Sequence, residues 1–390
     1  MTVKFVPIHD VDEFEISRFY KPTSHVIEHA LHLLPEAEIV TERPKDEFYF
    51  LLTSRRSIGW RTEFSDPSNL FYSDLLNKKC GLIIYLNEVE SLNVSSIVHG
   101  MKNLIRDLNI DSDLLYYIDS NVNNRSTLNN FNLNGSFFNY YDSLFVNNNY
   151  NETVKSIENL QERSKKMLLL GGKSREHRLK FIHKVLQLPN FEEDNFISTM
   201  SGSYFDNTIQ KSIKVEERLL DGFLHDTTIL DKFSEPTQHG PTHLFHLESS
   251  LHTDSYFQIV TSTWFELDLN RIEINEKHAR PMYSLQPFIV YGEPNTLKAF
   301  KEMGYKTYSN WIDESYDETY DDQLRFDKVV AVVESINAMS RVELSKIMKE
   351  MLPTLIHNIE HHNKRVNELE IEYNLFNDIT ETYKDYLTTQ

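Results

Sequence analysis

The run Gln286–Lys306, QPFIVYGEPNTLKAFKEMGYK, decides the fold of this chain. Its first part, Pro287–Tyr291, is apolar or aromatic and predicts a short buried strand. Gly292 and Pro294 interrupt the extended backbone, so a tight turn must follow. The run therefore encodes a strand, a turn and then a helix.

The helix after the turn fills the rest of the run. We expect Asn295 or Thr296 to cap its N-terminus and Gly304 to end it. Its apolar positions have helical spacing and are Leu297, Phe300 and Met303. Just upstream, Asn275–Pro281 reads NEKHARP, a charged cluster. In parallel α/β sheets, ligands collect beyond the carboxyl ends of strands, where helix N-termini offer N–H groups to phosphate. We therefore expect this cluster to face the ligand-binding edge of the sheet.

A second unit of the same kind occupies Lys165–Leu188, KKMLLLGGKSREHRLKFIHKVLQL. Met167–Leu170 predicts a buried strand, Gly171–Gly172 a turn, and the remainder an amphipathic helix. This helix begins among basic residues that would attract phosphate, namely Lys173, Arg175, His177 and Arg178. The alternative is a solvated first helical turn. GGKS is also similar to the end of a phosphate-binding P-loop, but Met167 stands where that motif needs its first glycine.

The N-terminal half also predicts parallel α/β structure. Buried strands are expected at Phe48–Leu52, Gly81–Leu86 and Leu114–Ile118, with a helix at Val94–Leu108. The segment Asn121–Asn151 is rich in Asn, Phe and Tyr and predicts irregular structure, followed by a linking helix from about residue 154 to 164.

A loop with three arginines follows the first of these strands. It reads TSRRSIGWR, and Arg55, Arg56 and Arg61 could bind an anion or simply face solvent. A histidine cluster further along, His239, His243 and His246, has metal-ligand residue types. Proline and glycine prevent a regular helical face there and no cysteine joins the cluster, so we expect ordinary histidines and no metal.

Composition restricts the functional class. The 390 residues, 46.0 kDa, favour two domains, and the net charge of -19 argues against a surface that grips nucleic acid as a whole. A single cysteine, Cys80, excludes a disulfide framework and suits a reducing compartment. The opening MTVKFVPIHDVDEFE lacks the apolar region of a signal peptide, and no stretch reaches transmembrane length. We expect a cytoplasmic protein without membrane insertion.

The C-terminal region predicts helices. An acidic run, Asp313, Glu314, Asp317 and Glu318, has the character of a solvated face and receives no role. Helices are expected at Asp322–Ile336 and from Val342 onward, with a break or kink at Pro353. The last helix has nearly heptad spacing and either packs back on the body or forms a homodimer. The expected domains are 1–155 on the acceptor side, 156–336 on the donor side, and C-terminal helices at 337–390.

Five runs together resemble a family of mostly uncharacterised glycosyltransferase-like proteins common in phages and some bacteria. The runs are Lys173–Leu179, Ile259–Phe265, Asn275–Met282, Gln286–Tyr308 and Ile312–Asp317, and they cover roughly the C-terminal half. The distal block is also similar to the donor domain of fucosyltransferase-like GT-B enzymes. The resemblance implies an α/β, GT-B-like fold with two Rossmann-like domains facing a cleft. It further implies a nucleotide sugar as co-substrate, with no cofactor and no required metal.

The resemblance also implies roles for residues. Glu276 and Lys277 would contact the ribose or diphosphate of the donor, and Arg178, with Arg175 or His177, would neutralise the diphosphate. The full donor-binding set is Lys173, Arg175, His177, Arg178, Thr261, Glu276, Lys277 and Arg280, and the candidate acceptor-binding set is Arg55, Arg56 and Arg61. Arg and Lys can stabilise the charge that develops on a departing nucleoside diphosphate.

Three positions depart from the family pattern. Ser262 replaces an expected glutamate, Asn275 replaces a threonine, and Asn295 replaces a glycine. A general base must deprotonate the acceptor hydroxyl and is expected from the N-terminal domain, where Asp10, Asp12 and Glu13 are acidic candidates.

Three functional hypotheses follow. The first is sugar transfer from a nucleotide sugar to a saccharide, a protein or modified phage DNA. The second is a non-catalytic binding or assembly protein that keeps the glycosyltransferase fold, which Ser262 and the heptad-like tail favour. The third is a phosphotransferase built on GGKS.

Overall fold

The computed structural model of the protein describes residues 3–8, 37–40, 44, 48–55, 70–86, 94–108, 110–119, 128–137, 149–171, 174–207, 209–218, 249–265, 272, 274 and 276–367. The chain divides into two compact units. Unit 1 comprises Met1–Tyr140, Asp268–Glu273 and Arg365–Gln390, and unit 2 comprises Tyr141–Leu267 and Ile274–Lys364. Each unit is built on a parallel sheet, so the predicted mixed α/β class is confirmed.

The sheet of unit 1 has the strand order β2-β1-β3-β4-β5-β6, and its neighbouring strands pair in parallel. Its strands are β1 (Val3–Ile8), β2 (Ala37–Ile39), β3 (Tyr49–Arg55), β4 (Cys80–Leu86), β5 (Leu115–Asp119) and β6 (Asn134–Phe137). Its helices are α3 (Leu70–Leu76), α4 (Val94–Leu108) and the 3-10 turn η1 (Ser112–Leu114). The predicted central strands and the helix between them are therefore confirmed.

Strand β6 corrects one expectation, because it lies inside Asn121–Asn151, which we predicted to be irregular. Its sequence, NGSF, is not apolar, but it pairs in parallel with β5, where Tyr117 faces Gly135. Backbone pairing with a strongly apolar neighbour can order a short edge strand whose own side chains carry little β preference.

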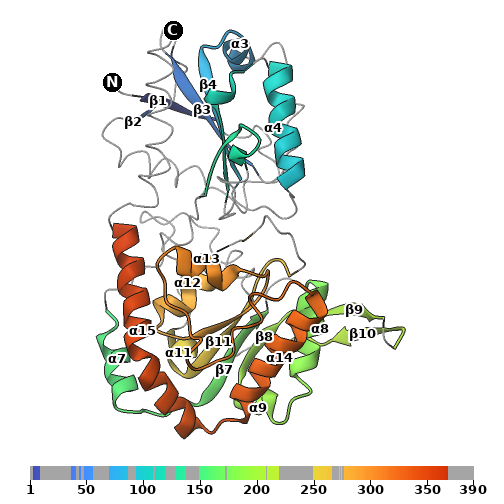
Figure 1. The fold of residues 1–390 in the computed structure, drawn as a ribbon, viewed down its shortest axis with the longest axis vertical. Helices are drawn as coiled ribbons and strands as arrows, with labels where there is room; N and C mark the ends of the chain where they lie inside the picture. Colours follow the sequence, from blue (N-terminus) through green and yellow to red (C-terminus); the bar gives the residue numbers. More distant parts are fainter. Residues whose placement is uncertain are drawn as a thin grey trace. The chain divides into compact units, whose positions relative to one another are not determined.

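The sheet of unit 2 has the order β12-β11-β7-β8 and is also parallel (Figure 1). Its strands are β7 (Lys165–Gly171), β8 (Phe196–Thr199), β11 (Ser255–Thr261) and β12 (Phe288–Tyr291). An antiparallel hairpin, β9 (Gly202–Asp206) and β10 (Lys211–Val215), follows β8. The chain adds β8 on one side of β7 and then returns to add β11 on the other side. The topological switch point therefore lies between β7 and β11.

Helices cover the sheet of unit 2. They are α7 (Asn151–Glu158), α8 (Glu176–Val185), α9 (Phe191–Asp194), α11 (Ser249–Thr253), α12 (Glu276–Tyr283), α13 (Thr296–Glu302), α14 (Asp322–Ala338) and α15 (Arg341–Asn367). The predicted linking helix exists as α7, shifted toward the N-terminus. The β7–α8–β8 and β11–α12–β12 crossovers run in opposite directions along the sheet, so right-handed connections place α8 and α12 on opposite faces.

Helix α15 continues through Pro353, where we predicted a break or a kink, so the break does not occur. The packing of its apolar face against unit 2 outweighs the lost backbone hydrogen bond. The buried apolar residues of α15 are Leu344, Met348, Met351, Leu352, Leu355 and Ile359. The Lys349 ammonium bonds the carbonyl of Glu158, and the Asn358 amide bonds Lys306. The described part of this helix therefore packs back on its own unit.

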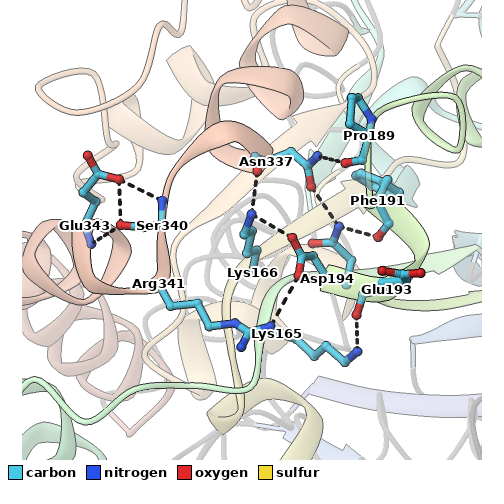
Figure 2. Close-up of polar contacts among 11 residues, drawn as sticks. Lys165, Lys166, Pro189, Phe191, Glu193, Asp194, Asn337, Ser340, Arg341 and Glu343 are labelled. Carbon is cyan, nitrogen blue, oxygen red and sulfur yellow. Dashed lines mark hydrogen bonds and ion pairs between the residues drawn. The ribbon is translucent and has the colours of Figure 1, made fainter.

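A polar network fixes the elbow between α14 and α15 to the amino end of β7 (Figure 2). The Lys166 ammonium lies 2.8 Å from the Asp194 carboxylate and 2.7 Å from the carbonyl oxygen of Asn337. Arg341 contacts the same carboxylate at 3.3 Å. In a parallel sheet, all amino ends of the strands lie at one edge and all carboxyl ends at the other. This network stabilises the edge formed by the amino ends. The carboxyl end is left for the site described next.

Candidate functional site

The switch point between β7 and β11 brings together the two basic segments that the sequence singled out. Helix α8 begins just after the carboxyl end of β7, and the loop 262–265 follows the carboxyl end of β11. Loops diverge at a switch point and leave a crevice, which is where open α/β sheets bind ligands. The arrangement of the start of α8 and the loop 262–265 determines what the site can bind.

Arg178 links helix α8 to the loop 262–265. It is only 3% exposed, and its guanidinium points at the carboxyl end of β11. Nε and Nη2 donate to the Ser262 carbonyl at 3.1 and 2.8 Å, and Nη2 also donates to the Thr261 carbonyl at 3.0 Å. Arg178, which was predicted to bind phosphate, therefore also has a structural role: it holds the end of β11 to helix α8 while supplying positive charge.

Arg175 extends the same pattern by one residue. It occupies the N-cap position of α8, and its Nη1 donates to the Thr263 carbonyl at 2.8 Å. The guanidinium carbon lies 4.8 Å from the ring centroid of Trp264, a cation–π contact. Both side chains are half-buried.

His177 is neutral at physiological pH. Its Nε2 lies 3.4 Å from the Ser262 carbonyl, so the ring donates there in the Nε2–H tautomer. Burial, together with the nearby Arg178 and Arg175 charges, lowers the pKa of His177 to about 4. His177 therefore adds a hydrogen-bond donor to the site and no charge, which changes the expectation that four cations gather here.

A third arginine, Arg325 of α14, holds the far end of the loop. It is 1% exposed; its Nε donates to the Gly292 carbonyl at 3.1 Å and its Nη1 to the Thr319 carbonyl at 2.9 Å. Its Nη2 donates to the Phe265 carbonyl and lies 2.7 Å from the Asp322 carboxylate. The sequence reasoning missed this residue. Its signal was a lone cation in the buried helical stripe of α14, at the spacing of Val329 and Val333.

The three arginines share one function in the fold. The carbonyls of Thr261, Ser262, Thr263 and Phe265 each accept a hydrogen bond from an arginine side chain. A loop held through so many of its carbonyls is fixed in one conformation before any ligand arrives. It also collects positive charge at the carboxyl edge of the sheet.

A stack of aromatic side chains packs against the loop 262–265 and stabilises this edge of the sheet. Tyr291 lies between Phe181 and Phe265, with ring centroids 4.2 and 4.4 Å apart, and the Arg325 guanidinium covers Phe265 at 4.3 Å. The Tyr291 hydroxyl donates to the carbonyl of His177 at 3.1 Å. Stacked rings tie β12, α8 and the β11 loop into one rigid body.

Helix α12 approaches the same loop from the other face of the sheet. The Ser262 hydroxyl lies 3.4 Å from Nε2 of His278, which is fully buried. Its neighbour Lys277 is half-buried at the start of the helix, and Arg280 is 6% exposed one turn later. Glu276 opens the helix at its first residue. The two predicted motifs thus meet on Ser262, one through its carbonyl and the other through its side chain.

Thr261 and Ser262 are enclosed, each 1% exposed. The Thr261 hydroxyl donates to the Leu170 carbonyl of β7 at 3.4 Å. A Cβ atom at Gly292 would lie 2.3 Å from the Ser262 hydroxyl oxygen, so this glycine leaves room for serine and little more.

Helix α13 corrects the expectation for its N-terminal cap. Asn295 is its N-cap residue with φ 66 and makes no side-chain cap, and the Thr296 hydroxyl bonds the Glu293 carbonyl instead. The Asp317 carboxylate closes this helix end, because its oxygens lie 2.8 and 3.0 Å from the backbone nitrogens of Leu297 and Lys298. The N-terminus of α13 therefore holds an internal anion.

The acidic run consequently has structural roles that spacing alone did not reveal. Glu314 accepts hydrogen bonds from the Tyr308 backbone N–H and the Thr307 hydroxyl, both at 2.6 Å. Burial raises the pKa of Asp317 to about 6, against the opposing effect of its two N–H donors. The prediction that this run is a solvated face is wrong for Glu314 and Asp317, which are buried, and it fits Asp313 and Glu318, which are exposed.

No protein-family model matches the chain, and no curated protein matches it. A solved structure described as "Crystal Structure of alpha1,3-Fucosyltransferase" is similar to it. The likeness covers 94% of this chain and 90% of that one, at 11% identity and a TM-score of 0.41.

Several predicted residues lie outside the described part of the chain. They are Arg56, Arg61, Lys173, His239, His243, His246, Asp10, Asp12 and Glu13. Arg55 ends β3, at the carboxyl edge of the sheet of unit 1. Among the described residues, no group of three or more His, Cys, Asp or Glu side chains is placed to hold a metal ion. Within the same residues, none of the helices has the length and apolar character needed to cross a membrane.

Proposed function

We propose that this protein is a glycosyltransferase that moves a sugar from a nucleotide-sugar donor to a hydroxyl group of an acceptor. The observation that carries the proposal is the convergence of Arg175, Arg178 and the start of α12 on the loop after β11, at the switch point of unit 2. A positively charged, preorganised edge at this position suits a diphosphate. The family resemblance of the five sequence runs supports the same function.

The donor diphosphate would bind between the start of α8 and the start of α12. Arg178 is already engaged with two carbonyls, so its contribution is chiefly the field of a buried cation. Lys277 is half-buried and would make the direct contact, with Glu276 on the ribose, as the resemblance implies. Because His177 is neutral, its role would be hydrogen bonding and not charge neutralisation.

Bond cleavage at the anomeric carbon leaves negative charge on the nucleoside diphosphate. Fixed cations stabilise that charge without reorganising, which is the usual source of rate in such sites. The acceptor hydroxyl must lose a proton as it attacks, and a carboxylate general base would accept that proton. The acceptor is a saccharide, a protein or modified DNA, with Arg55, Arg56 and Arg61 as its proposed contacts.

A second candidate, a non-catalytic binding protein that keeps this fold, is favoured by one observation. Ser262 replaces a carboxylate, and its hydroxyl is enclosed by Gly292 and His278. Such a protein would bind its ligand at the same edge and would not turn it over.

The test is a thermal-shift screen of the full chain against UDP-, GDP-, CMP- and dTDP-sugars, followed by an assay for release of the nucleotide, which is a nucleoside diphosphate for all of these donors except CMP-sugars, which release CMP. A glycosyltransferase is stabilised by one donor class and releases the nucleotide of that donor. Lys277→Ala should abolish the shift, whereas Lys184→Ala, an exposed lysine near the C-terminal end of α8, should keep it. Stabilisation without release would favour the second candidate, and no stabilisation by any donor would refute the proposal.

A further inference from the structure

We infer that Trp264 is the stacking platform for the base of the bound nucleotide. This inference rests on the proposed function and deepens it, because it assigns a residue that selects the ligand by its aromatic ring. Trp264 lies in the loop after β11, at the switch point, next to the arginines that would attract the phosphates. No motif of the sequence gave this residue a role.

The orientation of the indole is fixed from two directions. Its backbone belongs to the loop whose carbonyls at Thr263 and Phe265 are held by Arg175 and Arg325. Its ring is covered by the Arg175 guanidinium, 4.8 Å from the centroid. A side chain held in this way loses little conformational entropy when a ligand packs on it, which favours tight binding.

Neighbouring side chains on the loop have different environments. Phe265 is 6% exposed and belongs to the internal stack with Tyr291. Trp264, one residue earlier, is half-buried and keeps part of its surface in contact with solvent. Thus Phe265 supports the loop, while Trp264 is the large aromatic side chain of the loop that a ligand can reach.

The cation beside the indole favours a base over a sugar ring. A guanidinium on one face of an aromatic ring draws electron density toward itself. The C–H groups of a sugar pack best on an electron-rich face, whereas a nucleobase stacks by offset overlap of its π system and tolerates an electron-poor partner. Arg175 lies beside Trp264 and Arg178 holds the same loop, so one nucleotide could place its base on the indole and its phosphates near these arginines.

The experiment uses tryptophan fluorescence in the full chain. The sequence holds three tryptophans, Trp60, Trp264 and Trp311, so the Trp60→Phe/Trp311→Phe variant leaves Trp264 as the single reporter. Titration with UDP and GDP should quench or shift its emission, and titration with inorganic pyrophosphate should leave it unchanged. A response to free monosaccharide but not to nucleoside diphosphate would overturn the base assignment.

Affinity measurements on otherwise wild-type protein complete the test. Trp264→Ala should weaken nucleoside diphosphate binding roughly ten- to a hundredfold, and Trp264→Phe should stay within about threefold of wild type. Trp311→Ala is the matched control, because Trp311 bonds Glu350 and lies outside the site. If wild type binds UDP or GDP and Trp264→Ala binds it equally well, the inference is wrong and the proposed function stands. If wild type binds no nucleotide or nucleotide sugar at all, both are wrong.

Discussion

The Asp317 carboxylate and the backbone N–H of Leu297 form a 2.8 Å hydrogen bond that closes the N-terminus of α13. The second carboxylate oxygen takes the next N–H, that of Lys298, at 3.0 Å. In addition, the backbone N–H of Asn295 donates to the Asp317 carbonyl at 2.7 Å. A segment twenty residues downstream therefore completes the strand–turn–helix unit that the opening sequence run defines.

Removal of this cap should destabilise the protein. Asp317→Ala leaves two N–H groups of α13 without their acceptor, which should lower the free energy of unfolding by about 1–2 kcal/mol. Glu318→Ala changes an exposed neighbour and should shift it by less than about 0.5 kcal/mol. Urea denaturation of both variants measures the difference, and equal values would contradict the capping role of Asp317.

The protonation of His177 should make stability depend on pH. Its pKa is 6.5 in an ordinary environment and about 4 in the folded protein. Between these values the unfolded chain binds more protons, so the contribution is complete above pH 6.5 and is lost as pH falls toward 4. The loss at pH 5 should be about 2 kcal/mol. His177→Gln keeps a donor for the Ser262 carbonyl and lacks this titration. The wild-type curve of unfolding free energy should fall below that of the variant on acidification, and parallel curves would contradict the assignment.

Replacement of Arg178 should damage the fold before it reports on a ligand. Arg178→Ala strips the buried carbonyls of Thr261 and Ser262 of a charged donor and should cost about 2–4 kcal/mol of unfolding free energy. Lys277→Ala, at a half-buried site, should cost less than about 1 kcal/mol. Denaturation curves of the two variants decide this, and an Arg178→Ala protein as stable as wild type would show that the clamp is dispensable.

The close contact between Gly292 and Ser262 leaves no room for a methyl group at position 292. Gly292→Ala places a Cβ 2.3 Å from the serine hydroxyl oxygen and 2.6 Å from its Cβ, which should cost about 1–3 kcal/mol through overpacking. Adding Ser262→Gly to this variant should recover part of the loss. A double-mutant cycle measures the coupling, and purely additive effects would show that the two residues do not compete for space.

Strands and helices that depend only on residues close together in the sequence could be predicted well. Strands β7, β11 and β12 are continuous apolar runs because both faces of a parallel sheet are covered, and their buried character follows directly. Because they lie next to such strands, the basic segments that begin α8 and α12 are predicted to lie near the ligand-binding edge. Residue types and turn residues therefore located the candidate edge.

Contacts between distant segments could not be predicted. Asp317 looked like part of a solvated acidic run because nothing near it in sequence needs a carboxylate, and its partners are two backbone groups of α13. Arg325 received no role from the sequence, because two of its carbonyl partners, at Gly292 and Phe265, lie far from it in the chain. Pro353 predicted a break because propensity is local, whereas packing along α15 is not.

The pairing of β7 with β11 also governs how unit 2 can form. Ser255 stands opposite Lys165, a separation of 255 − 165 = 90 residues, while β7 and β8 are joined by a single short crossover. Chain entropy must be lost over that whole span before the central ladder yields any stabilisation, so its closure should be a late and slow step in folding. During synthesis, the emerging chain cannot assemble the arginine-held loop until residue 265 and Arg325 have both left the ribosome. The site is thus completed only when this late step in the folding of unit 2 has taken place.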